Sequence, residues 1–107
     1  MAFDLVIRNG LLIDGTGAAA RQADVAVADG RIAAIGSLAG QAARETVDAE
    51  GQVVAPGFID GHTHMDAQIY WDALGTCSSY HGVTTVVMGN CGFTLAPSRA
   101  DARELVV

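Results

Sequence analysis

The chain has 107 residues, enough for one small domain, and half of them are hydrophobic. Its 12 acidic residues against six basic ones give a net charge of −6, which argues against nucleic acids and anionic membranes as partners because both need a basic surface. With only two cysteines, no apolar run near the ~20 residues of a membrane span and no signal peptide, the chain is expected to be cytoplasmic.

The first half of the chain consists of short apolar stretches separated by turn signals. Asn9-Gly10 and Asp29-Gly30 each lie between apolar runs. Such pairs favour type I′ hairpin turns, which need positive φ at both positions. Glu50-Gly51 indicates another turn before Val53-Val54. We therefore predict a small antiparallel β module over residues 1–55.

The second half changes character after residue 55. The stretch "GFIDGHTH" is an apolar strand that ends in polar residues, and residues 65–81 show roughly helical spacing of apolar side chains. Residues 83–88 form a continuous apolar run, as expected for a strand covered on both faces. Strand, helix and strand in this order predict a parallel pair with a right-handed crossover. A further helix is predicted to begin near Ser98, the candidate N-cap.

Two histidines, His62 and His64, follow the first of these strands. Alternate residues of an extended chain project from the same face, with Cα atoms about 6.6 Å apart, so the two imidazoles suit one metal ion or an adjacent pair of ions. The alternative is two polar loop residues that are solvated or hydrogen-bonded. Asp66 is close enough in sequence to support a histidine ligand.

Cys91 lies 27 residues after His64, at the end of the next predicted strand. The carboxyl ends of neighbouring parallel strands share one edge, where (β/α)8 barrels carry their active sites. A thiolate there would be a good zinc ligand, although a buried, inert cysteine is the common alternative. Cys77 lies away from any predicted strand end and is interpreted as packing, and His81 as a helix-end residue.

These motifs resemble a known family. The stretch "VVAPGFIDGHTH" resembles the first barrel strand of the amidohydrolase superfamily, and "LVIRNGLLIDGTG" and "VAVADGRIAAIG" resemble strands of its N-terminal module. The stretch "GVTTVVMGNCGFTLAP" is similar to the N-acyl-D-amino-acid deacylase (D-aminoacylase) branch. The resemblance implies a mixed α and β fold. Residues 1–55 would form a small composite β-sandwich module, and residues 56–107 the first β-α-β unit of an incomplete (β/α)8 TIM barrel.

The resemblance also implies a site and a reaction. His62, His64 and Cys91 would bind one or two zinc ions, with Cys91 placed to bridge two metals. The implied reaction is zinc-assisted hydrolysis of the amide bond in a small N-acyl-D-amino acid. No catalytic residue falls within this chain. The general base, an aspartate, and two further histidines would follow in a longer protein, so the 107-residue chain alone is expected to be inactive.

Two other readings stay open at this stage. The protein could be another amidohydrolase, such as a cyclic-amide hydrolase or a deaminase, in which a later lysine would bridge the metals. As isolated, the chain could instead be a non-catalytic metal-binding fragment. The apolar stretch "VTTVVM" would then expose a strand edge, through which we predict self-association.

Overall fold

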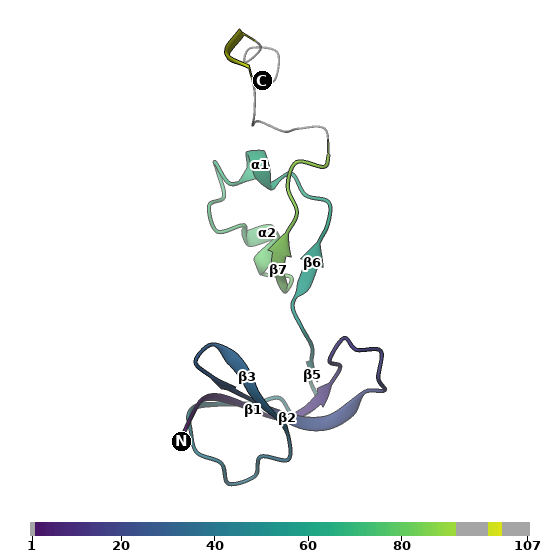
Figure 1. Cartoon of the computed structure of the whole chain (residues 1–107), viewed down its shortest axis with the longest axis vertical. Helices are drawn as coiled ribbons and strands as arrows, with labels where there is room; N and C mark the ends of the chain where they lie inside the picture. The colour runs from purple at the N-terminus through teal and green to yellow at the C-terminus, as the bar shows by residue number, and fades with distance from the viewer. Residues whose placement is uncertain (1, 92–98, 102–107) are drawn as a thin grey trace. The chain divides into compact units, whose positions relative to one another are not determined.

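The computed structural model describes residues 2–91 and 99–101. The chain divides into two compact units, Met1–Pro56 and Gly57–Val107 (Figure 1). The fold is mixed and strand-rich, as the sequence predicted. The interpretation of residues 1–55 and 56–107 as separate domains stays a prediction. Among the described residues, no helix is long and apolar enough to cross a membrane.

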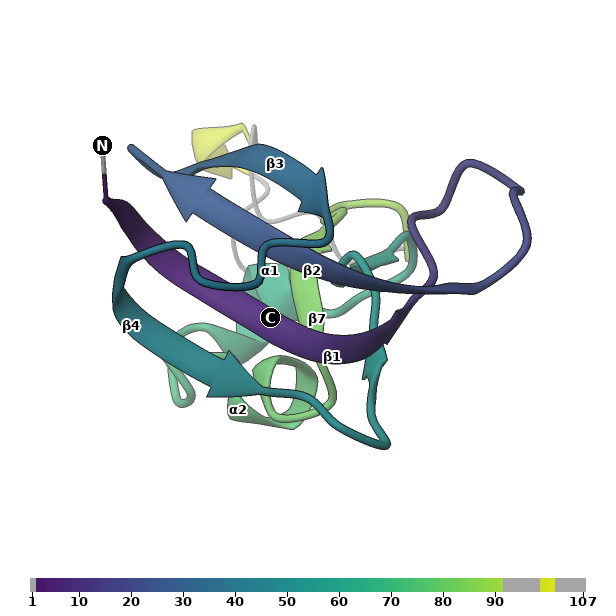
Figure 2. The same cartoon turned by 90° about the horizontal axis from the view of Figure 1, so that it is seen from below.

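The first unit is built on a single sheet with β1 at its centre. Its strands are β1 (Phe3–Leu12), β2 (Arg21–Ala28), β3 (Arg31–Gly36), β4 (Ala43–Asp48) and β5 (Val53–Val54). Figure 2 shows the order β3-β2-β1-β4, and β5 also pairs with β1.

The direction of two strands corrects the prediction of an antiparallel module. β1 pairs with β2, and β2 with β3, in antiparallel fashion, but β4 and β5 run parallel to β1. The antiparallel expectation was therefore wrong for β4 and β5. Turn dipeptides indicate the pairing only of strands that are neighbours in sequence. The connection from β3 to β4 instead crosses from one edge of the sheet to the other, where β4 pairs with β1.

Asn9-Gly10 does not form the predicted hairpin turn but lies inside β1. Asn9 has a φ of 60°, and the register of β1 against β2 shifts between Ile7 and Gly10, which is a β-bulge. The bulge turns the Asn9 backbone N–H toward the Asp24 carboxylate, 3.0 Å away. Gly10 is needed for a different reason, because a Cβ there would overlap the Val54 side chain.

The other two turn predictions are confirmed. Asp29 and Gly30 have φ values of 51° and 69° and join β2 to β3 as a hairpin. Gly51 has a φ of 74° in the turn that leads from β4 to β5. The Asp29 N–H also donates to Asp4 Oδ2 at 2.8 Å, which ties this hairpin to β1.

The buried core of the first unit is small and consists of Val6, Leu12, Val25, Ala26 and Ala49. Ile32 and Ile35 of β3 pair with apolar residues of β2, and Val47 of β4 pairs with an apolar residue of β1. The register places all three side chains on the same face of the sheet. These three side chains are 66%, 43% and 42% exposed. Val25, which pairs with Ile35, lies on the same face and is buried, so this apolar face is only partly covered by the described residues of this unit.

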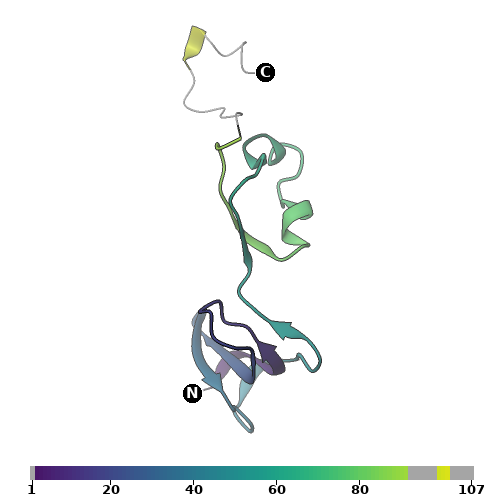
Figure 3. The same ribbon diagram turned by 90° about the vertical axis from the view of Figure 1, so that its right-hand side faces the viewer.

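The second unit contains the predicted parallel strand pair. β6 (Phe58–Asp60) pairs in parallel with β7 (Val83–Val86), which confirms the strand–crossover–strand prediction. The crossover carries two one-turn helices, α1 (Met65–Gln68) and α2 (Thr76–Ser79). Figures 1 and 3 show both helices on the same side of the two strands.

The helix expected within residues 65–81 is broken into two single turns, α1 and α2. The Asp72 carboxylate accepts the backbone N–H of Thr76 at 2.7 Å and its hydroxyl at 2.8 Å, a local arrangement that competes with helix continuation. The Thr76 hydroxyl bond lowers the pKa of Asp72. Gly75, with a φ of 55°, then reverses the backbone before α2. The helical spacing of apolar residues did not reveal this break.

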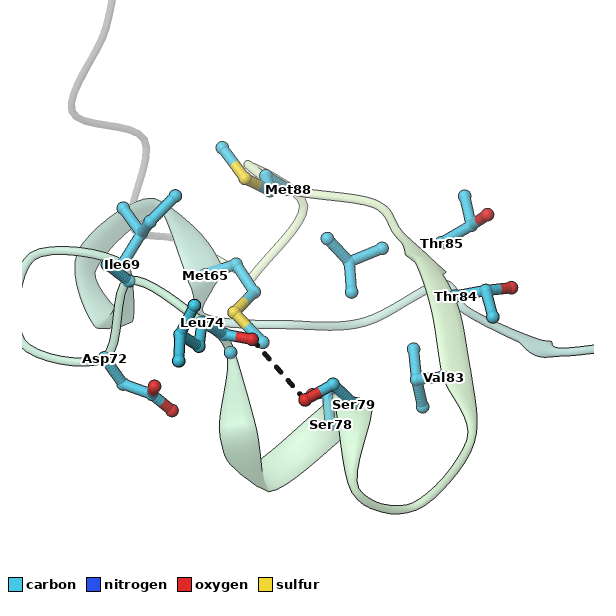
Figure 4. Close-up of a pocket in the computed structure, with 13 residues that line it drawn as sticks. Met65, Ile69, Asp72, Leu74, Ser78, Ser79, Val83, Thr84, Thr85 and Met88 are labelled. Carbon is cyan, nitrogen blue, oxygen red and sulfur yellow. Dashed lines mark hydrogen bonds between the residues drawn. The ribbon is translucent and has the colours of Figure 1, made fainter. Parts of the chain in front are cut away.

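The strand pair is only partly covered by the described residues of the second unit. Figure 4 shows an open hollow between the helical segment and β7, lined mainly by apolar side chains that include Met65, Ile69, Leu74 and Val83. On β6, Phe58 and Ile59 are 67% and 73% exposed within the described part of the chain. On β7, Val83 and Val86 are half-buried, whereas Thr84 and Thr85 are exposed. The described residues thus do not cover β7 on both faces, and self-association through its edge stays a prediction. The helix expected from Ser98 onward lies mostly outside the described residues.

Candidate metal centre

The segment after β6 presents two histidines on one side and a threonine on the other. The Asp60 carboxylate accepts the backbone N–H of His62 at 3.1 Å and so shapes the turn that follows the strand. His62 and His64 are exposed, whereas Thr63 between them is only 7% exposed. The rings of the two histidines lie 6.3 Å apart between centroids, with their planes 37° apart. The side chains therefore alternate as expected for an extended segment.

The segment after β7 brings Cys91 to the same place. The backbone N–H of Val87 donates to Asp60 C=O at 2.8 Å, which carries the pairing one residue beyond β7. Gly89 has a φ of 82°, a conformation that turns the chain and that few side chains tolerate. Asn90 Nδ2 donates to Gly61 C=O on the other segment. Cys91, the next residue, is half-buried.

The three predicted ligand atoms converge. His62 Nε2 lies 2.6 Å from Cys91 Sγ, and His64 Nε2 lies 3.2 Å from the same sulfur. All three ligand atoms lie within 4.8 Å of one another. The structure thus brings together residues 27 and 29 positions apart in sequence.

This donor set fits zinc. Two imidazole nitrogens and one thiolate sulfur are ligands that zinc takes at about 2.0–2.3 Å, which puts tetrahedral donors about 3.5 Å apart. The His64–Cys91 separation of 3.2 Å is close to this value. The His62–Cys91 separation of 2.6 Å is shorter by about 0.9 Å, so these two side chains must move apart for both to bind one zinc ion. These three donors would fill three of the four positions of a tetrahedral zinc site and leave one for water, substrate or a further residue.

The other candidate residues do not join this cluster. Cys77 is exposed, and its sulfur accepts a hydrogen bond from Gln68 Nε2 at 2.7 Å. His81 Nδ1 lies 2.7 Å from the backbone oxygen of Cys77. Asp66 Oδ2 is buried without a hydrogen-bond partner among the described residues, and its role as support for a histidine stays a prediction.

Sequence reasoning missed Thr63 and Asn90. The Thr63 hydroxyl donates to Val87 C=O at 2.8 Å, and Asn90 donates to Gly61, so each links one ligand segment to the other. A signal for Thr63 was present, because the middle residue of His-x-His must point away from the histidines in an extended chain. Asn90 carried no comparable signal, since its partner is a backbone oxygen 29 residues away.

The sequence of the chain is similar to those of known hydrolases. A model of the amidohydrolase family matches residues 45–107. A D-aminoacylase from Alcaligenes xylosoxydans xylosoxydans is 53% identical over 95 residues, which are 89% of this chain and 20% of that protein. An N-acyl-D-aspartate deacylase from the same organism is 47% identical over 94 residues, or 88% of this chain and 19% of that protein.

A solved structure shares the fold. The N-acyl-D-glutamate deacylase from Bordetella bronchiseptica, determined with zinc and a phosphonate inhibitor that mimics the tetrahedral intermediate, matches with a TM-score of 0.83 and 46% identity. The match covers 100% of this chain and 24% of that one. The chain therefore spans about a fifth of the length of the curated relatives described above.

Proposed function

This chain belongs to the amidohydrolase family, and from this we propose that it is the N-terminal part of a zinc-dependent hydrolase that removes the acyl group from N-acyl-D-amino acids. The convergence of His62, His64 and Cys91 carries the proposal. The D-aminoacylase relative at 53% identity and the zinc-containing deacylase structure support it.

In this proposal the histidines would hold the metal through Nε2 as neutral imidazoles, and Cys91 would hold it through Sγ as a thiolate. Zinc in such a site acts as a Lewis acid and makes water a competent nucleophile at neutral pH. The open, exposed side of the two histidines would admit the substrate amide. Whether one or two zinc ions are held depends on ligands from the rest of the protein.

We further propose that β6 and β7 are the first two strands of a (β/α)8 barrel. His62 and Cys91 both follow the carboxyl ends of parallel strands, which is where such barrels hold their catalytic groups. The proton that reaches the leaving amine needs a carboxylic acid or similar group. We propose that an aspartate elsewhere in the full-length protein supplies it.

The substrate class rests on what the relatives share. Their names specify N-acylated D-aspartate and D-glutamate as well as D-amino acids in general. The common chemistry is an acyl group on the nitrogen of a D-amino acid, with the side chain free to vary. We therefore propose the substrate class and leave the side chain of the D-amino acid open.

A cytoplasmic location of the protein stays a prediction.

The metal site is tested on the protein expressed from its complete gene. Zinc content after dialysis is measured for the parent, for Cys91→Ala and for the matched control Cys77→Ala, which removes the exposed cysteine outside the cluster. We expect Cys91→Ala to lose zinc and Cys77→Ala to retain it. Equal zinc in the parent and Cys91→Ala would exclude Cys91 as a ligand.

The reaction is tested separately with N-acetyl-D- and N-acetyl-L-amino acids. We expect hydrolysis of the D series. A preference for the L series, or ring opening of a cyclic amide instead, would contradict the substrate class and favour the cyclic-amide hydrolase alternative. Bound zinc without any turnover would favour a non-catalytic metal-binding protein.

A further inference from the structure

We propose that Thr63 and Asn90 are positioning residues that hold the two ligand segments together. The side chains of His62, His64 and Cys91 are then already arranged for a metal before it binds. This inference rests on the proposed zinc site. We name the pair of side-chain bonds, Thr63 to Val87 and Asn90 to Gly61, the clasp.

The clasp acts at and beyond the last backbone pair of the two segments, in which the Val87 N–H donates to Asp60 C=O. β6 ends at Asp60 and β7 at Val86, while the ligands lie two to five residues further along each segment. Without other links, both segments would move as loops and the ligand atoms would lose their mutual spacing. The clasp supplies two links beyond the strands, one from each segment to the other.

Thr63 is suited to this role by its place between the histidines. It is 7% exposed and donates to Val87 C=O at 2.8 Å. Any motion of the Thr63 backbone is transmitted directly to the two residues bonded to it, His62 and His64. Holding Thr63 inward thus holds both imidazoles outward, on the side where Cys91 lies.

Asn90 completes the clasp from the other segment. It is the residue directly before Cys91, and its amide nitrogen donates to Gly61 C=O, directly before His62. The bond therefore links the immediate neighbours of two ligands. Groups that hydrogen-bond to the ligand side chains themselves typically change metal affinity about 10- to 100-fold when they are removed. The clasp acts on the neighbouring backbone, so we expect an effect of about 10-fold, at the lower end of that range.

The test measures zinc affinity by competition with a chromogenic chelator, using the protein expressed from its complete gene. Thr63→Val removes the hydroxyl with little change in shape, and Asn90→Ala removes the second bond at an exposed position. Thr63→Ser keeps a hydroxyl and serves as the rescue. Thr85→Val is the matched control, because Thr85 is exposed on β7 and makes no side-chain hydrogen bond within the described part of the chain.

We expect Thr63→Val and Asn90→Ala each to bind zinc about 10-fold more weakly, with Thr63→Ser and Thr85→Val close to the parent. The Co²⁺-substituted protein gives a second readout, since the thiolate-to-cobalt absorption band should weaken in Thr63→Val and recover in Thr63→Ser. A purely structural role would lower the melting temperature and leave this band and the affinity of the folded protein unchanged.

Parent-like affinity and an unchanged cobalt band in both Thr63→Val and Asn90→Ala would overturn the clasp while leaving the zinc site intact. The clasp would also be overturned if the loss of zinc affinity in these variants were no larger than their fraction of unfolded protein explains. A parent that binds no zinc would overturn the proposed metal site, and the clasp with it.

Discussion

Replacing Gly57 by alanine should loosen the strand pair that carries the candidate metal centre. Gly57 lies directly before β6 and faces Thr84 of β7. A Cβ at this position would overlap Thr84 Oγ1 and Cγ2 and lie 2.8 Å from Thr84 Cβ. Rotation about χ1 can move the first two atoms but not the Cβ, so the backbones must separate.

The magnitude follows from two opposing terms. Overpacking of this kind costs about 1–3 kcal/mol. Alanine also restricts the unfolded chain relative to glycine, which returns about 0.4–1 kcal/mol of stability. We therefore expect Gly57→Ala to lower the free energy of unfolding by about 1–2 kcal/mol.

Urea denaturation measures this change, with Gly61→Ala as the matched control. A Cβ at Gly61 would meet no described atom within 4 Å, so that variant should be as stable as the parent or slightly more stable. Gly57→Ala should cost less in a Thr84→Gly background than in the parent, because the colliding side chain is then absent. A Gly57→Ala protein as stable as the parent, or an equal cost of Gly57→Ala in both backgrounds, would refute this account of the strand contact.

Two further outcomes are expected in the first unit. Val6 is 0% exposed, so Val6→Ala should cost about 2 kcal/mol in urea denaturation, whereas Val53→Ala, at a 56% exposed site, should cost little. Hydrogen bonds from Thr16 and Arg21 lower the pKa of Asp14 from 3.8 to about 2. The folded protein then binds fewer protons than the unfolded chain, so stability falls as the pH drops from about 4 to about 2. Asp14→Asn should weaken this dependence in acid denaturation, and an unchanged pH profile would contradict the linkage.

Several features could be predicted from the sequence because their causes are local. The Asp29-Gly30 hairpin follows from two residues that tolerate positive φ between apolar runs. The family followed from short motifs around His62, His64 and Cys91, and the comparisons confirm it. The parallel pairing of β6 with β7 followed from the order of strand, crossover and strand.

Other features depended on contacts between distant residues. Asn9-Gly10 has the same signal as Asp29-Gly30 but forms a bulge inside β1, because Asp24 of a neighbouring strand accepts the Asn9 N–H. The parallel direction of β4 beside β1 was likewise decided by a crossover that local turn signals do not describe.

By itself, the sequence determined the identities and spacing of the three candidate ligands and the strands after which they lie. Chemistry of this kind is carried by residue type and by the alternation of an extended chain, both of which are local. Only the tertiary structure decided that Cys91 Sγ lies within 3.2 Å of His64 Nε2, and that Thr63 and Asn90 link the two segments. Those separations depend on the register of β6 against β7, which is set by packing between residues far apart in the chain.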